Sequence, residues 1–181
     1  MQTRLVSMIL ILMCSYASIA QTMLVKDCGQ KAFPGKIPPG NYSGITHVGG
    51  DEYAVVSDKS ATDGFFLFRI DVDSVSGEIK NVENLGFWGD SLKNADCEGI
   101  AYRPSSGTFF ISRECDNVIS EYDSIGKNTG RKMNVPDVYK KCAGNYGFES
   151  LAYDEESHLF WTINELSLIH ISEPTRLLSI S

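Results

Sequence analysis

The middle of the chain alternates short apolar runs with turn residues, a pattern typical of β-strands joined by hairpins. Two such runs, residues 96–102 and 108–114, flank the turn formed by residues 104–107. A carboxylate begins the first run and another ends the second, at Glu98 and Glu114. Because the two open ends of a hairpin lie together, opposite its turn, we expect these two carboxylates to be neighbours.

The same unit occurs three times along the chain. Downstream, Glu149 and Glu165 are separated by the same spacing as the first pair of carboxylates. Upstream, a copy with a shorter turn has Ser43 in place of the first carboxylate and Asp58 in place of the second. A period of roughly 50 residues lies in the range expected for the blades of a propeller.

Each complete unit continues with two further strand-like segments. In the first unit, residues 64–71 predict a third strand and residues 78–86 a fourth. In the second unit, these strands are expected at 117–122 and 131–135, followed by a helical turn at 136–141. Four strands per unit, each pairing with the next, predict an all-β fold. The expected architecture is a β-propeller fragment of about two and a half four-stranded blades, forming an incomplete ring.

The two ends of the chain do not follow this repeat. Residues 1–20 have the positive start, apolar run and small residues of a secretory signal, with an uncleaved anchor as the alternative. A lead-in loop is expected at 21–41, the propeller domain at 42–165, and no membrane span after removal of the signal. The tail, 166–181, predicts no third strand and resembles translated sequencing-adapter read-through, with a genuine divergent tail as the alternative. On the first interpretation, the repeat is the front part of a longer protein.

Cysteines change the picture because an exported chain can form disulfides. Removal of the signal leaves Cys28, Cys97, Cys115 and Cys142, an even number that suggests two bridges. Cys97 and Cys115 flank the central hairpin and are the expected pair, which leaves Cys28 for Cys142. The alternative is that Cys28 lies in the N-terminal segment and stays unpaired.

The net charge and the absence of common catalytic motifs limit the functions that the sequence supports. The chain has 181 residues and a formal net charge of −7, which argues against a nucleic-acid-binding surface. The sequence contains no Gly-x-Ser-x-Gly elbow, no glycine-rich phosphate loop and no catalytic-cysteine context. The recurrent carboxylates are therefore the main candidates for chemistry.

These carboxylates should converge on one mouth of the central channel, where like charges raise one another's pKa or recruit a cation. Calcium suits several carboxylates, whereas the histidines lack the spacing of zinc ligands. The alternative is that the acids only cap turns or accept hydrogen bonds, although glutamate at four of five positions favours a site. The predicted metal ligands are Asp58, Glu98, Glu114, Glu149 and Glu165.

Two cationic residues, Lys59 and Arg113, stand next to predicted ligands in the sequence. A cation beside a group of carboxylates could hold a phosphate oxygen of a substrate. The alternative is a local ion pair that contributes little energy.

Several of these segments resemble a known family. Residues 96–101 with 112–114, and residues 147–152 with 164–165, are similar to the paired signatures of phytase-like, esterase-like propeller proteins. Residues 53–60 resemble the first-blade segment of that family, in which arginine is more usual than Lys59. The resemblance implies a secreted or periplasmic propeller that binds calcium at an acidic channel mouth and hydrolyses phosphate esters with metal-activated water.

Two functions follow as expectations, besides the possibility that this partial chain is inert. The first is an exported, calcium-dependent hydrolase whose partner is a small-molecule phosphoric or other ester. The second is a non-catalytic propeller that binds a glycan, a peptide or a protein across the channel mouth.

Overall fold

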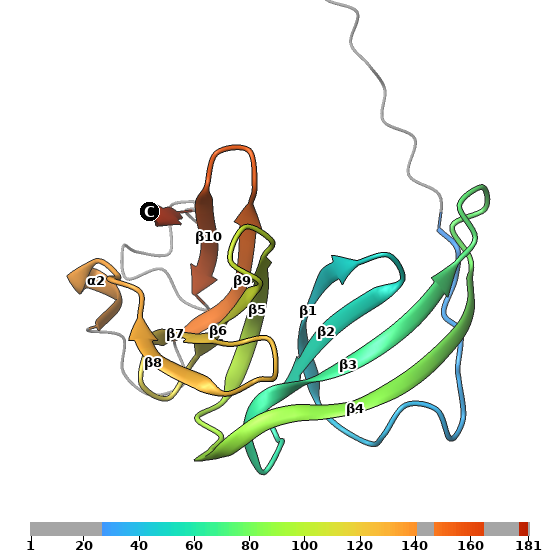
Figure 1. Ribbon diagram of the computed structural model, residues 1–181, viewed down its shortest axis with the longest axis horizontal. Coiled ribbons are helices and arrows are strands. Elements are labelled where there is room, and N and C mark those ends of the chain that lie inside the picture. The colour runs from blue at the N-terminus through green and yellow to red at the C-terminus, as the bar shows by residue number, and fades with distance from the viewer. Residues whose placement is uncertain (1–26, 141–146, 165–177, 181) are drawn as a thin grey trace, which may run out of the picture.

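A computed structural model describes residues 27–140, 147–164 and 178–180 of the chain. These residues form three antiparallel sheets that follow one another along the sequence (Figure 1). The one described helix is the short α2 (Asp137–Lys140), at the place where a helical turn was expected. The predicted signal lies outside the described residues. Within them, the prediction of an all-β fold is confirmed.

The first sheet is a four-stranded meander whose strands pair in sequence order. Its β1–β2 connection falls at Gly50 and Asp51. The fourth strand is much longer than expected. The strands are β1 (Tyr42–Gly49), β2 (Glu52–Ser57), β3 (Thr62–Val72) and β4 (Ile79–Lys93).

The second sheet repeats this order, with β5 (Cys97–Arg103), β6 (Thr108–Arg113), β7 (Val118–Tyr122) and β8 (Asn128–Lys132). Strand β8 begins three residues before the predicted start of the fourth strand at residue 131. The reason is an earlier turn, in which the Asp123 carboxylate accepts hydrogen bonds from the backbone N–H groups of Ile125 and Lys127.

The third sheet contains β9 (Phe148–Asp154), β10 (Leu159–Asn164) and β11 (Leu178–Ile180). Strand β11 pairs antiparallel with β10, and Trp161 lies opposite Ser179. The expectation that no third strand follows in this unit is therefore wrong, because the backbone of residues 178–180 supplies one. The rest of the tail lies outside the described residues.

The first strands of the three sheets, β1, β5 and β9, lie side by side. Glycine allows their backbones to approach closely. A Cβ atom on Gly44 of β1 would lie 2.7 Å from the Glu98 carbonyl oxygen of β5. A Cβ atom on Gly99 of β5 would lie 2.4 Å from the Leu151 nitrogen of β9. The neighbouring sheets are thus joined through backbone contact at their inner strands, as in neighbouring blades.

Two apolar layers fill the space between the sheets. Strand β6 is buried along its whole length, because its alternate side chains belong to different layers. The layer between the first and second sheets includes Val56, Phe65, Ile100, Phe109 and Ile111. The layer between the second and third sheets includes Phe110, Ile119, Phe148, Leu151 and Phe160.

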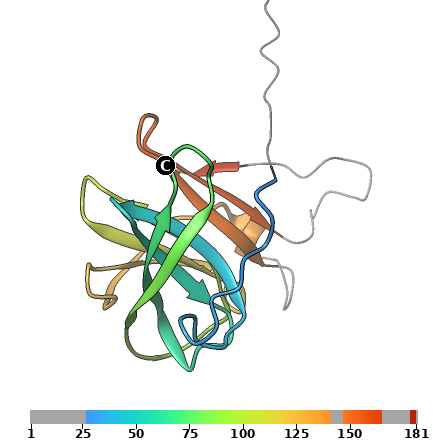
Figure 2. The same ribbon diagram turned by 90° about the vertical axis from the view of Figure 1, so that its right-hand side faces the viewer.

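The lead-in segment, residues 27–41, runs along the first sheet on the side away from the second sheet (Figures 1 and 2). Phe33 packs there against a small apolar cluster of Val55, Phe68 and Val82. The Tyr42 hydroxyl donates a hydrogen bond to the Pro38 carbonyl oxygen at 2.7 Å. The segment therefore covers part of an apolar face with the chain's own residues.

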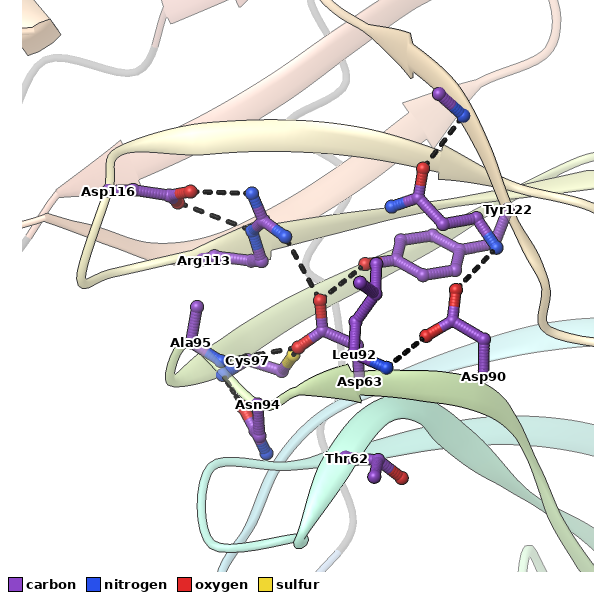
Figure 3. Close-up of polar contacts among 12 residues, drawn as sticks. Thr62, Asp63, Asp90, Leu92, Asn94, Ala95, Cys97, Arg113, Asp116 and Tyr122 are labelled. Carbon is purple, nitrogen blue, oxygen red and sulfur yellow. Dashed lines mark hydrogen bonds and ion pairs between the residues drawn. The ribbon is translucent and has the colours of Figure 1, made fainter.

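A buried carboxylate links the first sheet to the second (Figure 3). Asp63 of β3 is fully buried and accepts hydrogen bonds from Arg113 Nη1 and from the Tyr122 hydroxyl, each at 3.0 Å. It also accepts a hydrogen bond from the Ala95 N–H group at 3.2 Å. A buried ion pair is tolerated when its remaining polar atoms find partners, and this carboxylate has three donors besides a thiol.

The predicted disulfide between Cys97 and Cys115 is wrong. Both cysteines are free, because their thiols lie in different surroundings. The Cys97 sulfur is buried, 3.7 Å from Asp63 Oδ1, and this burial raises the pKa of the thiol. Cys115 is exposed, and its sulfur lies 3.7 Å from Asp96 Oδ2. The other predicted pair includes Cys142, which lies outside the described residues.

Replacing Gly99 with alanine should destabilise the fold. The new methyl group would meet the backbone of β9 at 2.4 Å, and the strand cannot move without disturbing the apolar layer. We expect the free energy of unfolding, measured with urea, to fall by about 2 kcal/mol, as is typical of overpacking. Gly40→Ala is the control, because its methyl group would meet the Tyr42 ring at 3.3 Å, where a side chain can adjust. Equal losses in the two variants would contradict close contact of the inner strands.

Replacing Asp63 with asparagine should also destabilise the fold, because the buried Arg113 would lose its fully buried counter-ion. We expect a loss of about 3 kcal/mol in the free energy of unfolding. Asp116→Asn removes the other, more exposed partner of Arg113 and should cost much less. The prediction fails if the two variants are equally stable.

Candidate metal site

Each inner strand begins with a β-bulge at the position that the sequence repeat singled out. In β5, Cys97 pairs with Arg113 and Gly99 with Ser112, so that Glu98 is the extra residue between them. A bulge changes the direction of a side chain and is common beside functional sites. The pairing of β1 and β9 shifts at the equivalent places, and the extra residues are Ser43 and Glu149.

The second carboxylate of each hairpin directly follows the second strand. The backbone N–H of Asp58, after β2, donates to the Asn41 carbonyl oxygen at 3.1 Å. The backbone N–H of Glu114, after β6, donates to the Asp96 carbonyl oxygen at 2.8 Å. These bonds hold the two ends of each hairpin together, as hairpin geometry predicted. Glu165, which holds the same position in the third unit, lies outside the described residues.

Three carboxylates meet where the first and second sheets adjoin. Asp58, Asp96 and Glu98 each offer one oxygen, and these oxygens all lie within 4.8 Å of one another. Oxygens that share one calcium ion at about 2.4 Å can be at most about 4.8 Å apart. The spacing is therefore compatible with a single bound cation.

Asp96 is a member of this group that the sequence did not predict. Its equivalents in the other two units are Asn41 and Gly147, so the comparison of repeats could not select it. Asp96 has a φ of 60°, in the left-handed region that aspartate tolerates better than most residues. The available signal was its place two residues before Glu98.

The electrostatics of the site centre on Glu98. Burial, together with the negative charges of neighbouring carboxylates, raises the pKa of its carboxyl group to about 7. These neighbours are Glu149, Asp58, Asp96 and Glu114, in order of decreasing effect. Three other predicted ligands, Asp58, Glu114 and Glu149, are thus within electrostatic reach of Glu98.

One carboxylate oxygen of Asp58 bears on whether these residues fit a cation. Its Oδ1 atom is buried and has no hydrogen-bond donor among the residues that the structure describes. A buried acceptor without a donor is destabilising, commonly by about 1–3 kcal/mol. A hard, oxygen-binding cation such as calcium would satisfy this atom, so the residues present fit such an ion.

Lys59 lies at the edge of the same group. Its ammonium nitrogen is 3.0 Å from Asp58 Oδ2 and 3.1 Å from Asp96 Oδ1, while 61% of its side chain is exposed. Its hydrogen bonds to these two carboxylates raise the pKa of Lys59. This lysine is therefore both part of the site and accessible from solvent.

Arg113, the other cation that the sequence proposed for substrate binding, is placed differently. Only 10% of its side chain is exposed, and its guanidinium donates to Asp63 and Asp116. This placement favours the ion-pair alternative for Arg113. The histidines near described strands, His47 and His158, lie by the hairpin turns, at the other end of the hairpins from the carboxylates.

The fold and the site together define a class of protein. It is an all-β protein built from propeller-type blades, with a group of carboxylates where two blades adjoin. Residues 37–181 match the family model of phytase-like proteins, described as "Esterase-like activity of phytase". The chain belongs to this phytase-like family. No curated protein sequence is similar enough to count as a match.

Solved structures with some similarity include the WD40 β-propeller domain of Doa1, with a TM-score of 0.45 and 10% identity. That alignment covers 69% of this chain and 35% of the Doa1 domain. Hydrazine synthase of Kuenenia stuttgartiensis has a TM-score of 0.42 and 9% identity, over 73% of this chain and 32% of the synthase chain. This chain thus spans about a third of each. In the part of the chain that the structure describes, no helix has both the length and the apolar character needed to cross a membrane.

The raised pKa of Glu98 predicts how stability depends on pH in the absence of metal. Between the ordinary value of 4.5 and the folded value of about 7, the folded chain holds a proton that the unfolded chain has lost. Its stabilising contribution is complete below pH 4.5 and is lost as the pH rises through 7. The free energy of unfolding, measured with urea and a chelator, should therefore fall between pH 5 and pH 8.

Glu98→Gln should flatten this decline and should be more stable than the natural protein at pH 8. Glu83→Gln, which removes an exposed carboxylate from β4, should leave the slope unchanged. A slope that persists in Glu98→Gln would assign the titration to another group.

Proposed function

We propose that this chain is part of an exported, calcium-dependent hydrolase of phosphoric or other esters. The observation that carries the proposal is the convergence of Asp58, Asp96 and Glu98 at the junction of two blades. Membership in the phytase-like family supports the same conclusion. Export to a secreted or periplasmic location rests on the signal-like residues 1–20 alone.

Charge explains why a cation is part of the proposal. The chain carries a formal net charge of −7, and Glu114 and Glu149 add to the negative field around Glu98. A phosphate ester would be repelled by such a surface unless a cation neutralised it. The unsatisfied Oδ1 of Asp58 supports the same need from within the site.

Each carboxylate of the site would have its own role. Asp58, Asp96 and Glu98 would hold calcium, while Glu114 and Glu149 would strengthen its attraction to the site. Calcium, when bound, would supply positive charge for an ester oxygen and would make a water molecule a better nucleophile. Glu98, with a pKa of about 7, would give up its proton when the ion binds.

The test combines binding with turnover. Calcium binding is measured by calorimetry, and hydrolysis is followed with nitrophenyl phosphate and nitrophenyl acetate. A chelator should abolish hydrolysis and added calcium should restore it. Asp58→Asn and Glu98→Gln should each weaken calcium binding and lower turnover by at least about tenfold. Glu83→Gln serves as a control for general loss of negative charge.

The outcomes separate the candidate functions. Turnover that is indifferent to both chelator and calcium would remove the metal from the proposal. Calcium binding without turnover of any ester in a broad panel would instead support the non-catalytic alternative, in which the channel mouth binds a glycan, a peptide or a protein.

A further inference from the structure

Lys59 already places a positive charge among the carboxylates of the candidate metal site. Its ammonium group bridges Asp58, which follows β2 in the first blade, and Asp96, which precedes β5 in the second. Both of these residues belong to the group of three whose oxygens lie within 4.8 Å. The lysine thus engages two of the three carboxylates that a bound cation would also need.

We propose that Lys59 is a built-in competitor of calcium, which holds Asp58 and Asp96 in the metal-free protein and is displaced when the ion binds. This inference rests on the proposed function, because it presupposes that the site takes calcium. As a consequence, the protein would bind calcium more weakly than the same carboxylates would without the lysine. The site would then be half-filled only at a higher concentration of the ion.

The competition follows from geometry and charge. Lys59 Nζ lies 3.0 Å from Asp58 Oδ2 and 3.1 Å from Asp96 Oδ1, whereas calcium binds oxygen at about 2.3–2.6 Å. An ammonium group and a divalent ion that share the same two carboxylates would lie within a few ångströms and repel each other strongly. The two occupants therefore exclude each other.

Lys59 is suited to leave, unlike the other cation near the site. Its side chain is 61% exposed, and lysine carries its charge on a flexible four-carbon stem that can swing into water. The ion pairs of an exposed side chain are of modest strength, so calcium can displace the lysine at a limited cost in affinity. Arg113, in contrast, is held between Asp63 and Asp116 with 10% of its side chain exposed.

The lysine also satisfies only some of the carboxylate oxygens of the site. It contacts Oδ2 of Asp58, while Oδ1 of the same carboxylate stays buried without a donor among the described residues. It reaches one oxygen of Asp58 and one of Asp96. Calcium accepts six to eight oxygens and would satisfy atoms that one ammonium group cannot reach.

The chain offers a matched control. Lys80 is likewise exposed and bridges two carboxylates, Asp73 at 3.6 Å and Glu78 at 3.3 Å. These carboxylates do not belong to the group that could hold a metal ion, which is the one such group among the described residues. Lys80→Gln therefore removes the same charge and the same type of ion pair at a distance from the site.

The first measurement is calcium affinity by calorimetry at constant ionic strength, for the natural chain, Lys59→Gln, Lys59→Arg and Lys80→Gln. Lys59→Gln should bind calcium about tenfold more tightly, since two exposed ion pairs no longer compete. Lys59→Arg keeps the charge and should stay within about threefold of the natural chain, as should Lys80→Gln. Circular dichroism confirms that each variant is folded.

The second measurement follows the lysine itself. In the natural chain, calcium should increase the rate at which acetic anhydride modifies Lys59, as measured by mass spectrometry, because the displaced amine loses its carboxylate partners. The rate at Lys80 should not change. A structural role for Lys59 that persists in the presence of calcium would leave both rates unchanged.

The outcomes distinguish this inference from the function on which it rests. Equal or weaker calcium binding by Lys59→Gln would overturn the competition while leaving the metal site intact. Absence of calcium binding in every variant, including the natural chain, would overturn the proposed metal site and the competition with it. Tighter binding by Lys59→Gln, together with faster modification of Lys59 in calcium, supports the proposal.

Discussion

The carboxylate of Asp63 is the interaction on which the arrangement of the blades and the site depends. It is fully buried in the first blade, and its hydrogen-bond donors Ala95, Arg113 and Tyr122 belong to the following connection and to the second blade. Two of these donors directly precede acidic residues in the sequence: Ala95 precedes Asp96, and Arg113 precedes Glu114. One buried charge therefore joins two sheets and fixes the backbone from which the site projects (Figure 3).

The β-bulges explain how a repeated architecture carries an acidic site. A bulge in each inner strand adds one residue to the ladder, and the added residue is Glu98 in the second blade and Glu149 in the third. In the first blade it is Ser43, whose hydroxyl donates to the Cys97 carbonyl oxygen at 2.6 Å. The same backbone feature thus serves contact between blades in one copy and presents a carboxylate in the others. Close approach at Gly44 and Gly99 brings these positions together.

Assembling carboxylates in this way carries an electrostatic cost, which is visible in the raised pKa of Glu98 and the unsatisfied oxygen of Asp58. Two cations near the site relieve different parts of it. Arg113 is buried beside Asp63 and stabilises the junction of the blades, whereas Lys59 is exposed and stays at the mouth of the site. The buried cation supports the fold, whereas the exposed one is in contact with solvent.

Strand periodicity and hairpin spacing are local properties, so the all-β class, the repeat and the positions of its carboxylates could be predicted from the sequence. It also placed Asp58 and Glu98 at one end of their hairpins. The packing of the blades against one another, in contrast, sets which residues meet between them. It added Asp96, which has no acidic equivalent in the other units, directed Arg113 into the core, and separated the thiols of Cys97 and Cys115. These outcomes depend on contacts between residues far apart in the chain, which local patterns do not encode.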